Sequence, residues 1–303
     1  MLTLAVVAGW GARWHWALEL TTHLQLHLAL ASIGLLIAAT IQRRSHAAGG
    51  ALLCLAVSGT PVARLETGGG AEVTEGPSLR LVGFNVHTDN PDPAALRQFV
   101  DEAAANVVFL YEVSPSLLRE LERLAPAKTV VVAKPRLDNF GIAAITTGPA
   151  EARLIESGTP GIRFAEVRLE RGGRSWSLLG VHPLPPLGAE MSRRRNRSLK
   201  RIADWVSQQR GPYVVIGDLN LTPFSPHFDD LLAAGLRNSQ RGFGYAGTWP
   251  ADLPSLLRIP IDHALVGDGV VVVDRRVGPS LGSDHLALAI EVAAGRDASS
   301  ARQ

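Results

Sequence analysis

The sequence is short of charge and of cysteine. Asp, Glu, Lys and Arg make up 19% of the 303 residues, against about 25% in typical soluble chains. The deficit lies at one end, because the first 63 residues hold one acid, Glu19, and three basic residues, Arg13, Arg43 and Arg44. The single cysteine, Cys54, excludes an intramolecular disulfide and a multi-cysteine zinc site. The net charge of +2, without a long basic tract, gives no sign of tight nonspecific nucleic-acid binding.

Three apolar stretches precede residue 65, namely Leu2–Leu18, Leu26–Ile41 and Gly49–Ala63. A helix needs about 20 apolar residues to cross the hydrocarbon core, with a lower limit of about 17. The second stretch is near that limit, and the other two are marginal alone. We therefore predict a membrane region over residues 1–64 with two or three transmembrane helices. A buried core of a soluble domain is the alternative reading.

Basic residues between the second and third stretches predict the orientation in the membrane. Arg43, Arg44 and His46 form a short cationic loop, and such loops stay on the cytoplasmic side. If the third stretch crosses the bilayer, the rest of the chain lies outside the cytoplasm. We expect a multi-pass protein of the inner (cytoplasmic) membrane with its large domain extracytoplasmic. If the third stretch only lies in the interface, the large domain faces inward.

The remainder divides into a linker, a large domain and a tail. Residues 65–78 are rich in glycine and have linker composition. Residues 79–292 alternate apolar strands with amphipathic helices, and strands outnumber helices. This pattern argues against a simple doubly wound sheet and favours a two-sheet α/β sandwich with outer helices. The polar tail, residues 293–303, is predicted to be disordered.

Polar residues of catalytic type cluster at the ends of the predicted strands, where open α/β sheets place their sites. Each of the six segments is weak alone, because a lone Asn or His after a strand is usually a turn or a cap. The segments are Phe84–His87, Leu110–Glu112, Gly180–Pro183, Gly217–Asn220, Ile261–Ala264 and Gly282–His285.

Taken together, this ordered set resembles the endonuclease/exonuclease/phosphatase superfamily, in a bacterial-type member with N-terminal membrane segments. That superfamily has the fold of DNase I, of the exonuclease III class of abasic-site nucleases, of inositol polyphosphate 5-phosphatases and of neutral sphingomyelinases. The resemblance covers residues 79–292, so we expect that domain to have the DNase I-like fold. It implies hydrolysis of a phosphate ester with a divalent cation, Mg²⁺ or Mn²⁺. Mg²⁺ suits this chemistry because it prefers oxygen ligands and keeps several waters.

The resemblance assigns three residues to the metal. Glu112 is the principal ligand, with Asn85 as its amide partner, and Asp284 binds or orients a second ion. Five more residues are assigned to catalysis. His285 is the expected general base, and Asp262 holds its imidazole in the correct tautomer.

The other three catalytic assignments concern the phosphate. Asp218 orients or polarises the attacking water or the leaving oxygen, and Asn220 donates to a nonbridging oxygen. His182 stabilises the charge at phosphorus or helps to protonate the leaving group. His263 neighbours Asp262, so on a strand it points to the opposite face and is expected to be structural.

The substrate stays open between a nucleic acid, a lipid head group and a small phosphodiester. The catalytic domain holds 24 basic and 23 acidic residues, whereas a dedicated duplex-DNA enzyme more often shows a basic excess. Six basic residues crowd the start of one predicted helix, Met191–Gln209. They form either a solvated face or a contact with phosphate or anionic lipid. No protein partner is evident. The alternatives are a noncatalytic membrane module that binds a phosphorylated ligand and a DNA endo- or exonuclease.

Overall fold

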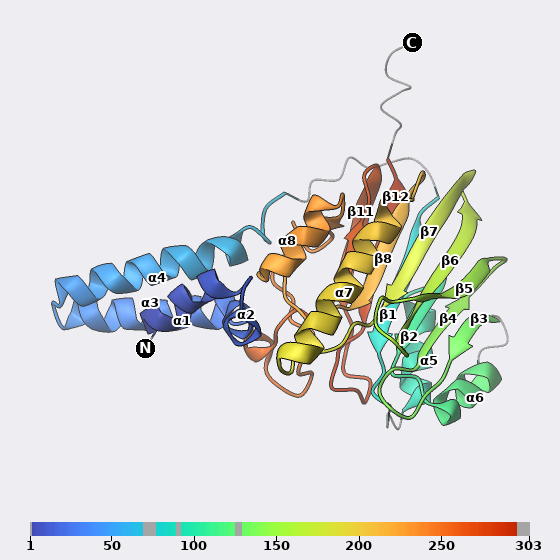
Figure 1. The fold of residues 1–303 in the computed structure, drawn as a ribbon, viewed down its shortest axis with the longest axis horizontal. Coiled ribbons are helices and arrows are strands. Elements are labelled where there is room, and N and C mark those ends of the chain that lie inside the picture. The colour runs from blue at the N-terminus through green and yellow to red at the C-terminus, as the bar shows by residue number, and fades with distance from the viewer. Residues whose placement is uncertain (1, 69–76, 89–91, 125–128, 296–303) are drawn as a thin grey trace, which may run out of the picture.

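The computed structural model describes residues 2–68, 77–88, 92–124 and 129–295. Within them, two six-stranded mixed sheets pack face to face and helices cover their outer faces (Figure 1). The predicted α/β sandwich is confirmed. The first sheet has the order β11-β12-β1-β2-β4-β3, with bounds Val270–Val277, Leu288–Ala294, Leu79–Asn85, Val107–Tyr111, Ile142–Thr146 and Thr129–Lys134. The second has the order β5-β6-β7-β8-β10-β9, with bounds Glu151–Glu156, Arg163–Arg171, Arg174–Val181, Tyr213–Asp218, Asp262–Val266 and Arg237–Asn238.

The central strands are apolar because both of their faces are buried. All five residues of β2 are buried, as are all five of β10. Large side chains such as Phe109, Trp176 and Ile216 fill the space between the sheets. Parallel pairing of β1 with β2 and of β7 with β8 brings the carboxyl ends of neighbouring strands together. Strand β10 runs antiparallel to β8, so its first residue joins the same edge.

Four helices flank the sandwich. Helices α5 (Pro93–Glu102) and α6 (Pro115–Leu124) pack on the first sheet through one apolar cluster. Helices α7 (Ala189–Val206) and α8 (Pro226–Ala233) pack on the second sheet through another. The sequence analysis missed β5, α8, the two-residue strand β9 and the 3₁₀ turn η2 (Ser255–Leu257).

The N-terminal residues form a separate helical extension (Figure 1). Helices α3 (Gln25–Ile41) and α4 (Ser45–Ala63) pack as a long hairpin whose turn lies far from the sandwich. The short helix α1 (Leu2–Ala8) packs on this hairpin, and a 3₁₀ turn, η1 (Gly9–Gly11), follows it. By length and composition, α4 is the one helix among the described residues that can cross a membrane unaided. Helix α2 (Trp16–Thr22) with α3 makes a second candidate if the pair, bent by 62°, counts as one broken span.

Helix α2 lies against the sandwich. Glu19, the single acid of the N-terminal region, is buried and accepts two hydrogen bonds from Arg195 Nη2, at 2.7 and 2.6 Å. Ser225 Oγ donates to the same carboxylate at 2.6 Å. His23, just after α2, contacts Thr222 in the loop that follows β8. These contacts fix one end of the helical extension to the second sheet.

Two predicted boundaries shift. Strand β12 continues to Ala294, and Val271 and Val270 pair with Ala293 and Ala294. The predicted tail therefore starts too early, and residues 296–303 lie outside the described residues. Leu65, at the start of the predicted linker, is buried, and its carbonyl accepts a hydrogen bond from the Gly242 N–H at 2.8 Å. Residues 69–76 of that linker also lie outside the described part.

Candidate active site

The polar residues predicted at strand ends meet at one edge of the sandwich. Asn85 ends β1 and Asp218 ends β8, whereas Glu112 and His182 directly follow β2 and β7. Asp262 begins β10 opposite Asp218. This convergence follows from the strand pairing. Gly217 permits it locally, because a Cβ at this position would lie 1.9 Å from the Val181 carbonyl oxygen.

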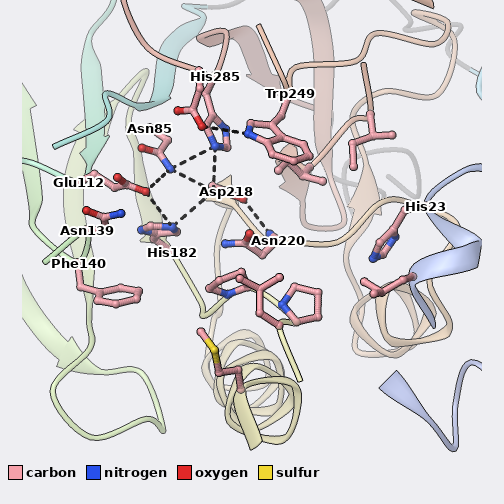
Figure 2. A pocket seen from close by; sticks show the side chains of 18 of the residues that line it. His23, Asn85, Glu112, Asn139, Phe140, His182, Asp218, Asn220, Trp249 and His285 are labelled. Atoms are coloured by element: carbon pink, nitrogen blue, oxygen red, sulfur yellow. Dashed lines mark hydrogen bonds and ion pairs between the residues drawn. The ribbon is translucent and has the colours of Figure 1, made fainter. Parts of the chain in front are cut away.

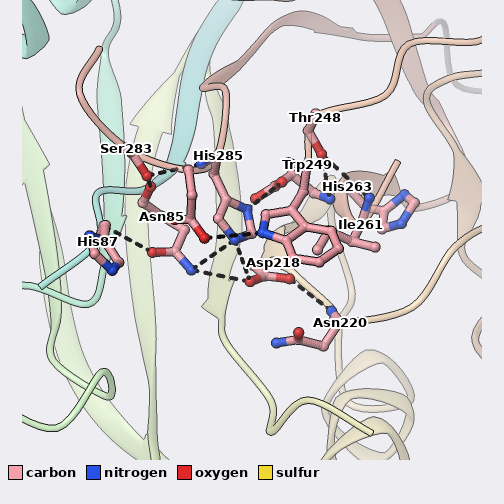
Figure 3. Close-up of polar contacts among 12 residues, drawn as sticks. Asn85, His87, Asp218, Asn220, Thr248, Trp249, Ile261, His263, Ser283 and His285 are labelled. Carbon is pink, nitrogen blue, oxygen red and sulfur yellow. Dashed lines mark hydrogen bonds and ion pairs between the residues drawn. The ribbon is translucent and has the colours of Figure 1, made fainter. Parts of the chain in front are cut away.

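Asn85 connects the two sheets at this edge (Figure 3). Its Nδ2 donates to Glu112 Oε1 at 2.9 Å and to Asp218 Oδ2 at 3.2 Å, and lies 3.4 Å from His285 Nε2. Its Oδ1 accepts from the His87 N–H at 3.1 Å. The amide therefore presents its NH₂ group to both carboxylates and orients them. As placed, Asn85 holds the carboxylate of Glu112 through Nδ2, and its Oδ1 already accepts one hydrogen bond from the backbone.

His285 and Asp262 form a buried pair. His285 Nδ1 donates to Asp262 Oδ2 at 2.9 Å, which leaves Nε2 facing Asp218 Oδ2 at 3.7 Å. Two further contacts hold the pair. Ser283 Oγ accepts from the His285 N–H at 3.0 Å, and Thr248 Oγ1 accepts from the Asp262 N–H at 3.3 Å. In the neutral imidazole, this arrangement makes Nε2 the proton acceptor, as a general base requires.

The electrostatics of the site couple these groups. Burial alone would lower the pKa of His285, but the carboxylates of Asp262 and Asp218 outweigh burial and raise it to about 10. Burial would raise the pKa of Asp218, but His285 and then His182 outweigh burial and lower it to about 2. Without a cation, the site is therefore an imidazolium held between carboxylates. A cation placed beside these carboxylates opposes the positive charge and lowers the pKa of His285 toward that of a usable base.

Glu112 has the features of a metal ligand. Its Oε1 accepts from Asn85, but its Oε2 is buried and has no hydrogen-bond partner among the described residues. A buried carboxylate oxygen without a partner is costly, and a hard divalent cation satisfies it. Glu112 also has a positive φ of 61°, which is rare for a residue other than glycine. A second carboxylate, Asp218, lies on the other side of Asn85, so the donor set fits a divalent cation.

A second acidic arrangement also has metal-ligand spacing. Potential ligand atoms of Asp218, Asp262 and His285 lie within 4.8 Å of one another. However, His285 Nδ1 and Asp262 already share a hydrogen bond. The donor atoms beside Glu112 and Asp218 therefore fit a cation better than the hydrogen-bonded His285–Asp262 pair does.

Asp284 is exposed, and its Oδ2 accepts from Trp249 Nε1 at 3.1 Å. It lines the same cavity as Glu112, but no contact joins these two residues. Asn220 lies beside Asp218, whose Oδ1 accepts the Asn220 N–H at 2.8 Å, while Asn220 Nδ2 donates to the Pro183 carbonyl at 3.1 Å.

His182 Nε2 lies 3.4 Å from Asp218 Oδ2, and its Nδ1 has no hydrogen-bond partner among the residues that the structure describes. His263, predicted to be structural, is buried away from this cluster. Its Nε2 donates to the Leu221 carbonyl at 2.9 Å, and its ring packs on Phe228.

A cavity of about 670 Å³ contains this cluster (Figure 2). Seven of the eight predicted site residues line it, and Asp262 lies behind His285. The sequence analysis missed Leu20 and His23, which reach the cavity from the N-terminal helix α2 and the turn after it. The apolar composition had placed both residues in the predicted membrane region. Their closeness to Glu19 in the sequence was the one signal that could have linked them to the cavity.

The fold and this cluster together define a phosphoesterase-type hydrolase. Residues 82–285 match the model of the endonuclease/exonuclease/phosphatase family, and the chain belongs to that family. No curated protein matches the chain by sequence.

Solved structures agree in fold. A humanized zebrafish (D. rerio) TDP2 superposes with a TM-score of 0.62 at 16% identity, over 71% of this chain and 99% of its own. An endonuclease/exonuclease/phosphatase protein from Bacteroides vulgatus gives 0.55 at 16% identity, over 72% and 99%. A truncated Caenorhabditis elegans TDP2 gives 0.57 at 14% identity, over 72% and 98%.

Proposed function

We propose that this chain is a membrane-anchored phosphoesterase that uses a divalent cation, Mg²⁺ or Mn²⁺, to hydrolyse a phosphate ester by attack of water. One observation carries the proposal. The unpartnered oxygen of Glu112 and the acceptor nitrogen of the His285–Asp262 pair line or adjoin one cavity, with Asp218 and Asn85 between them. A metal ligand and a proton acceptor set this close to each other are what phosphoryl hydrolysis needs.

Each residue of the cluster has a separate role in the proposed reaction. When bound, the cation neutralises charge on the phosphate oxygens. His285 Nε2 takes a proton from the attacking water as the new bond to phosphorus forms, and Asp262 stabilises the resulting imidazolium. Asp218, whose Oδ2 lies 3.4 Å from His182 Nε2 and 3.7 Å from His285 Nε2, orients that water. Asn220 donates to a nonbridging oxygen, and His182 provides the proton or the positive charge for the leaving oxygen.

The helical hairpin supports anchoring in a membrane. Exposed leucines and isoleucines cover α3 and α4, among them Ile37, Ile41, Leu52 and Leu53, and large apolar patches of this kind mark membrane or protein contacts. The hairpin turn with Arg43 and Arg44 lies at the end far from the sandwich (Figure 1). With that turn in the cytoplasm, as the positive-inside rule favours, two spans return the chain to the outer side. The catalytic domain is then extracytoplasmic.

The noncatalytic alternative has less support. A protein that only binds a phosphorylated ligand would not need the proton-accepting His285–Asp262 pair close to the Glu112 carboxylate. A DNA nuclease has one supporting comparison. A D. rerio TDP2 complexed with a single-strand DNA product shares the fold, with a TM-score of 0.60 at 17% identity. At this identity the likeness shows the fold alone and does not indicate which substrate this chain takes.

The test uses the full chain held in amphipol, because Leu20 and His23 belong to the cavity wall. Bis-p-nitrophenyl phosphate and p-nitrophenyl phosphate are assayed with Mg²⁺, Mn²⁺ or EDTA, beside His285→Ala. Metal-dependent turnover that is lost in the variant supports the proposal. A folded protein that binds Mg²⁺ and turns over neither ester supports the noncatalytic alternative. A reporter fused after Gln303 tests orientation, and a cytoplasmic signal contradicts the extracytoplasmic assignment.

A further inference from the structure

The cavity has two chemically different ends. In Figure 2, Glu112 and His182 lie on one side of Asp218, and His23 lies at the opposite end on the N-terminal segment. Between and around them, the wall is largely apolar. Besides Leu20, the apolar lining residues are Phe140, Pro185, Pro186, Leu187, Met191, Trp249, Ile259 and Ile261. A single phosphate cannot use this apolar surface.

Helix α2 is fixed in place as a wall of this cavity. The buried Glu19–Arg195 pair holds α2 on α7, one residue before Leu20. Arg195 Nη1 also donates to the Asn220 carbonyl at 3.4 Å. The guanidinium of Arg195 therefore contacts both Glu19 on the N-terminal helix and the backbone of Asn220 at the proposed active site.

His23 completes this wall beside Leu20. Its Nδ1 lies 3.0 Å from Thr222 Oγ1 and 3.4 Å from the Thr222 backbone nitrogen, so the loop after β8 fixes the ring. The side chain is 7% exposed and lines the cavity.

The charge of the cavity disfavours a nucleic acid. No lysine or arginine is among the described residues that line it, whereas four carboxylates are, on Glu112, Asp138, Asp218 and Asp284. Strand binding needs cations along the backbone and aromatic platforms for the bases. One cation at Glu112 can hold one phosphate. Among the described lining residues, no Lys or Arg is present to bind the neighbouring phosphate of a nucleic-acid strand.

Exposed apolar side chains lie both in the cavity wall and in the turn that packs against the hairpin. Leu187 lines the cavity and is 69% exposed. Leu256 and Leu257, in the 3₁₀ turn η2 (Ser255–Leu257), are exposed as well, and this turn lies against α3. Ile259, two residues after the turn, lines the cavity. With α3 in a bilayer, this side of the cavity would lie near the lipid surface.

We propose that the substrate is a lipid phosphate ester, with its phosphate at Glu112 and its hydrocarbon chain along the α2 wall formed by Leu20 and His23 and along Leu187, which lines the same cavity. This inference rests on the proposed hydrolytic function and adds the substrate class. Leu20 and His23 are then specificity-determining residues supplied by the N-terminal helices. The substrate enters from the hairpin side.

The test is a series of alkyl p-nitrophenyl phosphates from methyl to octyl, assayed with Mn²⁺ and the full chain in amphipol. All members share the diester and the leaving group, so only the hydrocarbon changes. Thymidine 5′-p-nitrophenyl phosphate represents a nucleotide. We expect kcat/KM to rise roughly fourfold for each methylene that is buried, and at least about 100-fold from methyl to octyl.

Two variants locate the effect. Leu20→Asn and Leu187→Asn are each expected to lower the octyl-to-methyl ratio at least about tenfold, since a polar amide replaces the apolar wall. Leu187 is exposed, so its substitution keeps the test valid even if Leu20→Asn releases α2. The control is Val273→Asn on β11, 48% exposed and outside the cavity, which should keep the wild-type ratio.

The outcomes separate the two proposals. Metal-dependent turnover with a flat chain-length series, or with the thymidine ester preferred over octyl, overturns the lipid inference and leaves the hydrolase standing. A steep series unaffected by both leucine variants overturns the assigned wall. No metal-dependent turnover of any diester or of p-nitrophenyl phosphate overturns the proposed function together with this inference.

Discussion

The buried ion pair between α2 and α7 offers the sharpest test of how the N-terminal helices are joined to the sandwich. Arg195 is 0% exposed and Glu19 is 1% exposed. Arg195→Met keeps the approximate length of the side chain but removes four donor contacts, two to Glu19, one to the Asn220 carbonyl and one to Asn196 Oδ1. The carboxylate of Glu19 then stays buried with the hydroxyl of Ser225 as its remaining donor.

The expected loss follows from the uncompensated charge. Removing one partner of a buried pair costs about 3–5 kcal/mol. For a domain of 150–250 residues, each kcal/mol lowers Tm by about 2–4 °C, so Tm should fall by about 6–20 °C. The loss should be smaller in the double variant Glu19→Leu with Arg195→Met, because two apolar side chains leave no buried charge. We expect the double-mutant cycle to return a coupling of at least about 2 kcal/mol.

The assay is thermal unfolding of the full chain in amphipol, followed by circular dichroism for the wild type, both single variants and the double variant. Arg193→Met serves as the control, because Arg193 is exposed and pairs with the exposed Glu190 on the same helix, a type of pair worth about 1 kcal/mol or less. The reasoning is refuted if Arg195→Met unfolds within about 1 kcal/mol of the wild type. It is also refuted if the two single effects simply add.

Three further predictions concern the catalytic cluster. Glu112→Gln should weaken Mn²⁺ binding at least about tenfold in calorimetry, because a hard cation loses its main carboxylate. The control Glu190→Gln should bind Mn²⁺ as the wild type does. Equal Mn²⁺ affinity of Glu112→Gln and the wild type contradicts the metal assignment. His285→Ala should lower kcat by about 10²–10⁴, and Asp262→Asn by less, so a loss under about tenfold for His285→Ala removes it as the base. In EDTA, the pKa of His285 at about 10 exceeds its unfolded value of 6.5, so its stabilisation is full below pH 6.5 and is lost as pH rises through 10. The difference in free energy of urea unfolding between wild type and His285→Asn should therefore shrink by up to about 1.4 kcal/mol per pH unit across that range, and a constant difference contradicts the pairing.

The sequence was sufficient to predict the sandwich and the convergence of the polar residues, because both depend on local patterns. Apolar strands followed at once by Asn, Glu, His or Asp predict an edge where these side chains gather. Parallel pairing then brings Asn85 and Glu112, or His182 and Asp218, to neighbouring positions. Strand β5 was missed because its alternation, Glu151 to Glu156, is short and half-exposed. Helix α8 was missed although Ser225 and Pro226 are usual signals for a helix start.

Contacts between distant segments were harder to predict. Asp284 follows the Ser-Asp-His pattern expected of a metal ligand, but its carboxylate accepts from the indole of Trp249, which lies 35 residues away in the sequence. Such a pairing depends on how two loops fold over the cavity. The periodicity of one strand or helix does not contain that information.

The basic residues at the start of α7 also show that contacts between distant segments are hard to predict from the sequence. A solvated face describes most of these residues well, since Arg193 pairs with Glu190 and Lys200 with Asp204 at the surface. Arg195 differs because its position on the helix turns it toward α2. A buried guanidinium needs a carboxylate, and Glu19, 176 residues away, is the acid that α2 provides. The N-terminal region is poor in charge, but the position of its acid has a structural consequence. Its one acid is placed where it joins the helical extension to the catalytic domain, and the neighbouring Leu20 is thereby brought into the cavity.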